Sequence, residues 1–165
     1  MDIGRILKHL ILPPWTVRRA FAASGMAAIE AAIRETEKSH LGEIRFAVES
    51  VLDFGPLLRG QLARQRAIEV FSHLKLWDTE QNSGVLIYLL LADRDVEIVA
   101  DRGICRRVAR EEWEAVCREM ETAFRGGRFE EGVIGGVRRV GAILAKHFPA
   151  AGPNPDELPD RPAVL

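Results

Sequence analysis

Four oxygen-bearing side chains lie beside the most apolar run of the sequence, and their types suit a hard divalent cation. Asp78, Asn82 and Ser83 precede this run, which spans residues 85–92, and Asp101 comes shortly after it. Carboxylate, amide carbonyl and hydroxyl oxygens are the ligands that Mg²⁺ and Ca²⁺ prefer in proteins. A divalent ion in such a position can polarise a phosphate group. The pattern therefore predicts a metal site made by Asp78, Asn82, Ser83 and Asp101.

A second set of carboxylates offers an alternative metal site. Glu49 ends one predicted strand and Asp53 follows it, and Asp93 and Asp95 follow the next strand. Ligands of open α/β sheets bind at the carboxyl ends of parallel strands, which favours this set. Acidic residues are also common in hairpin turns for conformational reasons alone. Glu49, Asp53, Asp93 and Asp95 are therefore the alternative prediction.

The first set also has an interpretation without any ion. Asn82 and Ser83 suit a turn that opens a strand, and Asp101 suits an ion pair with Arg102 or Arg128. Under this interpretation the side chains serve the fold rather than a ligand. The sequence leaves both interpretations open.

The other reactive residue types form no recognisable catalytic motif. The sequence has four histidines: His9, His40, His73 and His147. Their spacing does not match that of a transition-metal site. The cysteines, Cys105 and Cys117, fit neither a disulfide framework nor a zinc ribbon. The glycines of residues 132–141 fall inside a helical pattern, so they predict close helix packing and no phosphate loop. Catalytic residues therefore stay unassigned, and no nucleotide cofactor is expected.

The elements that carry these side chains follow from hydrophobic periodicity. Residues 43–49 alternate as a strand, residues 85–92 have the pattern of a strand covered on both faces, and residues 96–100 alternate as a half-exposed strand. Helical patterns span about 24–40, 57–77, 109–124 and 129–148. A helix between the first two strands implies that they are parallel, and the turn at 93–95 returns the third strand antiparallel. The sequence therefore predicts an α/β fold, a three-layer α/β/α sandwich with a small mixed β-sheet.

This topology separates the two candidate metal sites. The alternative set gathers where the parallel strands end, and we call this part of the sheet the Asp93 end. The first set gathers where the parallel strands begin, and we call this part the Ser83 end. We favour the Ser83 end, where Gly84 and Gly103 also lie.

Several short motifs resemble one known family. The predicted hairpin holds, in order, Ser83-Gly84-Val85-Leu86, Asp93-Arg94 and Asp101-Arg102-Gly103-Ile104, and residues 124–132 read Phe-Arg-Gly-Gly-Arg-Phe-Glu-Glu-Gly. In this order they resemble the TPM-domain family, also called the TPM phosphatase family, over about residues 27–148. Three polar positions differ, because the family pattern has Asn, Gly and Asp where this chain has Ser83, Asp101 and Arg128. The last two changes suggest a swapped ion pair between Asp101 and Arg128.

The resemblance implies both a chemistry and a setting. It implies a metal-assisted phosphatase acting on phosphate esters, and TPM-family proteins are commonly linked with LemA-type membrane proteins, which implies a membrane-associated protein partner. We predict a divalent-ion-binding or adaptor domain that acts with such a partner and binds Ca²⁺ or Mg²⁺. The metal-assisted phosphatase is the alternative function.

Composition bounds the setting further. Lys plus Arg number 23 and Asp plus Glu number 24, so the formal charge of -1 gives no electrostatic reason to expect nucleic acid binding. The longest apolar run is far shorter than the roughly 20 residues of a membrane-spanning helix, and no signal peptide pattern is recognisable. TPM-family proteins often carry a signal sequence and a membrane anchor, so the chain resembles a short soluble variant. The expected location is cytoplasmic, peripheral to the inner membrane.

The 165 residues divide into one predicted domain and two flanking segments. The TPM-like domain spans residues 24–148. Residues 1–23 hold an amphipathic segment that either packs on the domain or docks on a membrane surface or a partner. Residues 149–165 hold five of the eight prolines and little to bury, which predicts a disordered tail.

Overall fold

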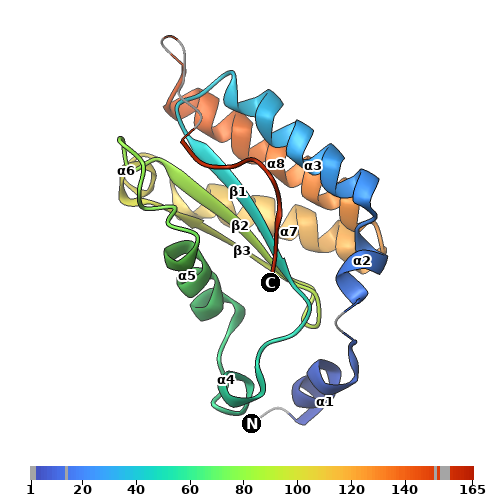
Figure 1. Ribbon diagram of the computed structural model, residues 1–165. Coiled ribbons are helices and arrows are strands. Elements are labelled where there is room, and N and C mark those ends of the chain that lie inside the picture. The colour runs from blue at the N-terminus through green and yellow to red at the C-terminus, as the bar shows by residue number, and fades with distance from the viewer. Residues whose placement is uncertain (1–2, 14, 151, 153–156) are drawn as a thin grey trace.

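A four-stranded mixed sheet forms the centre of the molecule (Figure 1). The structure is a computed structural model that describes residues 3–13, 15–150, 152 and 157–165. The strands are β1 (Glu43–Glu49), β2 (Gly84–Leu90), β3 (Asp95–Ala100) and β4 (Ala163–Val164), in the order β3-β2-β1-β4. β1 pairs parallel with β2 and with β4, whereas β2 pairs antiparallel with β3. The prediction of a small mixed sheet is confirmed.

Helices cover both faces of this sheet. One face packs against α3 (Ala23–Glu37), α7 (Arg110–Arg125) and α8 (Phe129–His147), and the other packs against α4 (Phe54–Leu58) and α5 (Ala63–His73). Alternate strand residues serve the two layers, so Ile87 belongs to the core with Phe124, whereas Tyr88 belongs to the core with Val70. Every residue of β1 and β2 is buried. The three-layer α/β/α sandwich is therefore confirmed, and the apolar run was a strand covered on both faces.

The glycines of α8 allow its neighbouring helices to approach closely. A methyl group on Gly132 would contact Phe124, and one on Gly136 would overlap Met120, both in α7. One on Gly141 would overlap Thr36 in α3. Helix packing, rather than a phosphate loop, explains these three positions.

The crossover between β1 and β2 differs from its prediction. The sequence predicted one helix over residues 57–77, but the chain forms α4 and then α5. Gly60 lies between them with φ of 76°, a left-handed conformation that no α-helix contains. The apolar spacing on either side of Gly60 is helical, so periodicity alone could not locate the break.

The C-terminal segment also corrects a prediction. Residues 157–165 are not a disordered tail, because β4 pairs parallel with β1 and the Leu165 N–H donates to the Val48 carbonyl at 3.0 Å. Asp160 is buried in the same segment. The prolines that suggested disorder all precede a two-residue strand whose partners lie more than 100 residues away in the sequence. Residues 151 and 153–156, which the same prediction included, lie outside the described residues.

Three short helices complete the chain. They are α1 (Ile3–Ile11), α2 (Thr16–Ala20) and α6 (Arg102–Cys105). α1 lies against the Asp93 end of the sheet, and α6 lies at the Ser83 end (Figure 1). Within the described part of the chain, no helix has the length and apolar character needed to cross a bilayer.

Candidate functional site

Close backbone contacts build the Ser83 end of the sheet. A methyl group on Gly84 would overlap the Leu76 carbonyl, and one on Gly103 would lie 2.6 Å from the Asn82 carbonyl oxygen. The Asp101 N–H donates to the Gly84 carbonyl at 2.9 Å, which ties the start of β2 to the end of β3. The two motif glycines are therefore explained by close approach of three backbone segments.

The four residues of the first predicted metal site do not form one cluster. Asp78 and Asn82 are exposed, whereas Ser83 and Asp101 are buried. Among the described residues, no three His, Cys, Asp or Glu side chains are grouped to hold a metal ion. An ion at this end stays a prediction, and it would need oxygens from a ligand or from water.

The suggested ion pair between Asp101 and Arg128 does not form. Asp101 Oδ1 instead accepts from the Arg102 N–H at 2.6 Å, where it caps α6. Arg128 pairs with Glu131 at 3.0 Å, one turn along α8. Each of the two residues therefore has a local partner, and their departures from the family pattern are not a swapped pair.

Two buried oxygens at the Ser83 end lack hydrogen-bond partners in the described part of the chain: Ser83 Oγ and Asp101 Oδ2. The backbone of Ser83 is fully used, because its N–H donates to Thr79 Oγ1 at 2.9 Å and its carbonyl accepts from the Glu43 N–H at 3.1 Å. Buried polar atoms without a partner are uncommon and suggest a missing ion, water or ligand. These two oxygens are therefore the strongest local sign of binding.

A cavity of about 430 Å³ adjoins Ser83. Its polar lining includes Arg106, Arg107 and His147, and none of its described lining residues is acidic. Arg107 stacks over the Phe148 ring at 4.9 Å and donates to the His147 carbonyl at 3.4 Å. These contacts hold the guanidinium of Arg107 in place, and both Arg106 and Arg107 are exposed to solvent. The cavity is therefore cationic and offers hydrogen-bond donors to an anion.

At the Asp93 end, Glu49 is already occupied by other side chains. It accepts two hydrogen bonds from Arg66, at 2.9 Å and 3.0 Å, and one from the Tyr88 hydroxyl at 2.7 Å. Burial raises the pKa of the Tyr88 phenol, and the neighbouring Glu49 carboxylate raises it further. This buried group of three serves the fold and leaves Glu49 no free oxygen for an ion.

Asp93 and Asp53 are also separated. Asp93 accepts from Arg5 Nε at 2.9 Å and lies 3.2 Å from His9 Nε2. The other imidazole nitrogen accepts from the Leu52 N–H at 3.0 Å, so His9 joins α1 to the Asp93 end of the sheet. Asp53 is exposed at the start of α4. Asp53 and Asp93 therefore do not form one cluster with Glu49 and Asp95.

Asp95 lines a separate cleft between β3 and α7, with a volume of about 590 Å³. Burial raises the pKa of Asp95 to about 6, and the charges of Glu97 and Glu121 add to this rise. Arg110 and Arg118 line the same cleft, so its charges are mixed. Cys117 also lines it, but burial raises the pKa of this thiol to about 12, which argues against a nucleophilic thiolate. The alternative set is thus divided over several locations.

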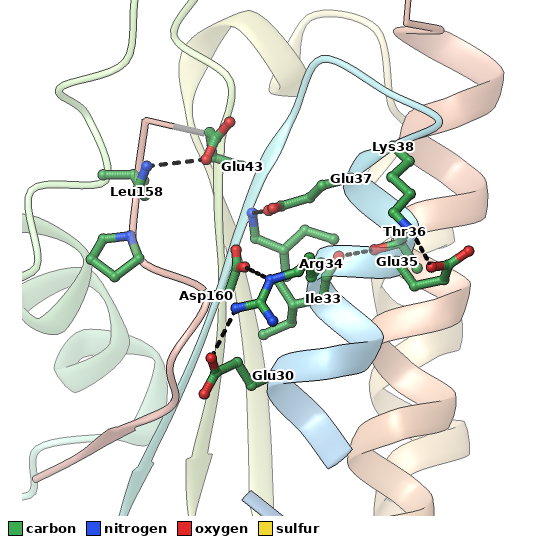
Figure 2. Close-up of polar contacts among 12 residues, drawn as sticks. Glu30, Ile33, Arg34, Glu35, Thr36, Glu37, Lys38, Glu43, Leu158 and Asp160 are labelled. Carbon is green, nitrogen blue, oxygen red and sulfur yellow. Dashed lines mark hydrogen bonds and ion pairs between the residues drawn. The ribbon is translucent and has the colours of Figure 1, made fainter. Parts of the chain in front are cut away.

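A buried carboxyl cluster lies beneath the C-terminal segment, and no sequence pattern indicated it (Figure 2). Glu43 Oε2 accepts from the Leu158 N–H at 3.2 Å, and Asp160 Oδ2 accepts from Arg34 Nε at 3.1 Å. Glu37 lies beside them and accepts from the Ile44 N–H at 2.7 Å. Burial raises the pKa of Glu37 to about 9, and nearby Glu43 and Asp160 contribute to the rise. The cluster fastens the last residues to α3 and β1.

This cluster predicts a pH dependence of folding. A carboxyl whose ordinary pKa of 4.5 rises to about 9 stabilises the fold fully below pH 4.5, and this stabilisation is lost as pH rises through about 9. We expect Glu37→Gln, which stays neutral, to unfold with a flatter pH profile and to exceed the wild type by about 1 kcal/mol or more at pH 8. Urea unfolding across this range measures it.

Glu35→Gln is the matched control, because Glu35 lies on the same helix, is exposed and pairs with Lys38 at 2.6 Å. It should leave the pH profile of the wild type unchanged. Parallel profiles for the wild type and Glu37→Gln would show that Glu37 is ionised in the folded protein.

The residues that line the cationic cavity were missed by sequence reasoning. Arg106 and Arg107 follow α6, and His147 ends α8, so more than 35 residues separate them in the sequence. A pair of adjacent arginines shortly after a glycine motif was the only available signal, and it has no specific spacing. Only the packing of the two helices beside Ser83 brings these groups together.

Comparison with known proteins agrees with this fold. The family model of the TPM domain matches residues 18–143. The solution structure of the BA42 protein from the psychrophilic bacterium Bizionia argentinensis is 32% identical, with a TM-score of 0.78 over 88% of this chain and 95% of that chain. No curated protein matches the sequence.

Two more distant structures share the fold. The N-terminal domain of a protein from P. gingivalis is 16% identical, with a TM-score of 0.63 over 86% of this chain and 95% of that chain. The N-terminal domain of the cg2496 protein from Corynebacterium glutamicum is 14% identical, with a TM-score of 0.55 over 75% of this chain and 74% of that chain. The match to the family model covers more than half of the 165 residues, and the chain therefore belongs to the TPM-domain family.

Proposed function

We propose that this chain is a binding or adaptor domain that engages an anionic group, best matched by a phosphate, in the cavity at the Ser83 end. The observation that supports this most is the buried Ser83 hydroxyl without a protein partner, next to Arg106, Arg107 and His147. Guanidinium groups donate several hydrogen bonds in a planar arrangement that suits phosphate oxygens. A hydroxyl adds one further donor at the inner wall.

A divalent ion is part of this proposal, as a companion of the anion. Ca²⁺ and Mg²⁺ need at least six oxygen ligands, and Mg²⁺ is commonly shared between one or two carboxylates and a phosphate. Asp101 Oδ2 and Ser83 Oγ are two such oxygens, while Asp78 and Asn82 are exposed nearby in the sequence. The protein alone supplies too few ligands, so we expect Ca²⁺ or Mg²⁺ to bind much more tightly when phosphate is present.

The adaptor role includes a membrane-associated partner, of the LemA type that family resemblance implies. The domain would then act in the cytoplasm, at the periphery of the inner membrane. A metal-assisted phosphatase is the second candidate, and the same unpartnered hydroxyl beside a cationic cavity favours it. The two functions share the ligand and differ in turnover.

A titration with inorganic phosphate, followed by backbone amide shifts of the labelled full chain, tests the proposal. We expect saturable shifts at Ser83, Gly103 to Arg107 and His147, and stronger binding when Mg²⁺ or Ca²⁺ is added. Arg106→Gln should weaken phosphate binding about tenfold, the equivalent of about 1.4 kcal/mol. Arg110→Gln is the matched control, because Arg110 is exposed, binds Glu114 and does not line this cavity.

Each outcome decides between stated alternatives. Shifts confined to Asp93 and Asp95, or equal losses in both arginine variants, would refute the cavity as the binding site. Release of nitrophenol from p-nitrophenyl phosphate by the wild type, with loss of release in Ser83→Ala, would favour the phosphatase over the adaptor. Binding without turnover would favour the adaptor.

A further inference from the structure

α1 contacts the rest of the protein through its polar side. Arg5 and His9 bind Asp93, and His9 also binds the backbone of Leu52. Ile6 is the helix residue that packs against the core beneath α5. An amphipathic helix of a globular protein normally buries its apolar face. Here the polar contacts fix α1 in the opposite orientation.

The apolar side of α1 is consequently exposed. The exposed fractions are 74% for Ile3, 54% for Leu7, 61% for Leu10 and 69% for Ile11. These residues recur at helical spacing and form one stripe along the helix. Large apolar side chains grouped on a surface mark interaction sites, whereas scattered ones do not.

Further large apolar side chains are exposed on neighbouring elements. Trp15 is exposed just before α2, and Phe54 and Leu58 are exposed on α4. α4 follows the Leu52 backbone that His9 binds, and Figure 1 shows α1 and α4 together at the lower end of the molecule. We call this surface the α1 face; it consists of Ile3, Leu7, Leu10, Ile11, Trp15, Phe54 and Leu58.

Basic side chains lie on α1 and α2, which carry most of the α1 face. Residues 3–29 contain Arg5, Lys8, Arg18 and Arg19 but no Asp or Glu, although the whole chain has a formal charge of -1. Lys8, Arg18 and Arg19 are exposed, and none of them pairs with a carboxylate in the described ranges. The positive charge at this end is therefore available to an external negative surface.

We propose that the α1 face binds the surface of an anionic lipid bilayer, with α1 lying in the plane of the interface. Apolar residues would enter the headgroup boundary, and the flanking lysine and arginines would contact lipid phosphates. Trp15 suits this depth, because tryptophan favours the interface between water and hydrocarbon. This inference goes beyond the ligand of the Ser83 end, and it uses residues from the opposite end of the sheet.

Vesicle flotation of the full chain tests the proposal. We expect the wild type to float with vesicles of phosphatidylcholine and phosphatidylglycerol in a three-to-one mixture, and to float less with pure phosphatidylcholine. Leu10→Glu should lower the partition coefficient at least tenfold. Lys8→Gln should lower it about fivefold, since one basic residue near such a surface contributes about 1 kcal/mol. Added salt should weaken wild-type binding further.

Trp77→Glu is the matched control for Leu10→Glu. The exposed fraction of Trp77 is 54%, close to the 61% of Leu10. Trp77 lies next to Leu76, which contacts Gly84 at the Ser83 end, away from the α1 face. The variant should bind vesicles like the wild type. In a Trp77→Phe background the remaining tryptophans are exposed Trp15 and buried Trp113. A shift of the emission to shorter wavelength on adding the anionic vesicles would then report on Trp15, because Trp113 is already shielded from water.

Three results would overturn the proposal. The first is a wild type that floats with neither vesicle. The second is an equal loss of binding in Leu10→Glu and Trp77→Glu. The third is a wild type that forms a dimer and does not bind vesicles, with Leu10→Glu dissociating the dimer. A second copy of the chain would then be the occupant of the α1 face. Because Arg106 and Ser83 lie elsewhere, phosphate binding at the cavity is measured independently of all three.

Discussion

Gly84→Ala is expected to destabilise the fold by about 3 kcal/mol or more, at the upper end of the range for overpacked sites. A Cβ atom at this position would overlap the carbonyl oxygen of Leu76, and it would also lie 3.1 Å from the Leu76 side chain. A carbonyl held by backbone cannot move aside as the end of a flexible side chain can. Gly84 also opens β2, whose residues are all buried, so the clash would displace the central strand. Urea unfolding, followed by circular dichroism, measures the loss.

Gly135→Ala supplies the matched control. Gly135 lies inside α8, and no atom lies within 4 Å of the position that its Cβ would occupy. Alanine in a helix interior is favoured over glycine, so this variant should gain about 0.5–1 kcal/mol. The same chemical change is thus expected to have opposite signs at the two positions. A loss below about 1 kcal/mol in Gly84→Ala would mean that the Leu76 backbone relaxes easily.

Hydrophobic periodicity predicted most of the sheet because its strands are buried in two distinct ways. β2 serves a core on each face and appears as an apolar run, whereas β3 is half-covered and appears as an alternating run. β1 alternates in sequence although all of its residues are buried, because its charged side chains have partners inside the protein. The helices α7 and α8 were predicted within about two residues for the same reason. Patterns of this kind report local burial and need no knowledge of distant contacts.

The elements that were missed depend on distant contacts instead. β4 is two residues long and exists because Ala163 and Val164 lie beside Ala47 and Val48. Its position is fixed further by the buried carboxyls that Leu158 and Arg34 contact, and no local pattern marks those carboxyls as buried. The proline-rich composition of residues 149–165 therefore predicted disorder, although the segment ends in a strand.

The sequence predicted where Ser83 and Asp101 lie in the fold but not which side chains surround Ser83. Topology correctly put Ser83 and Asp101 at one end of the sheet, because both follow from strand order. The predicted ligand set held two carboxylates and two neutral oxygens, yet the cavity beside Ser83 is lined by Arg106 and Arg107 after α6 and by His147 of α8. Side-chain exposure separated Asp78 from Asp101, and only the packed structure determines exposure.

Arg66→Ala is expected to cost about 3 kcal/mol, because it leaves a carboxylate buried without its counter-charge. Arg66 donates to both oxygens of Glu49, at 2.9 Å and 3.0 Å, and Glu49 lies almost wholly inside the sheet end. The Tyr88 hydroxyl would remain as a donor, but it carries no positive charge. The loss is measured by urea unfolding at neutral pH.

Two further variants separate the charge from the packing. Glu49→Gln combined with Arg66→Ala should be more stable than Arg66→Ala alone, because no ionised group is then left buried. If the double variant is as unstable as the sum of the two single variants, the cost of Arg66→Ala arises from lost packing of its alkyl chain.

Arg110→Ala tests whether distance or burial decides the cost. Arg110 Nε lies 2.7 Å from Glu114 Oε1, a shorter contact than either bond from Arg66 to Glu49. Both residues face water, so the exposed pair should contribute less than about 0.5 kcal/mol. Water can solvate Glu114 when its arginine is removed, whereas Glu49 has no such replacement. Equal losses in the two variants would mean that water reaches Glu49 as readily as it reaches Glu114.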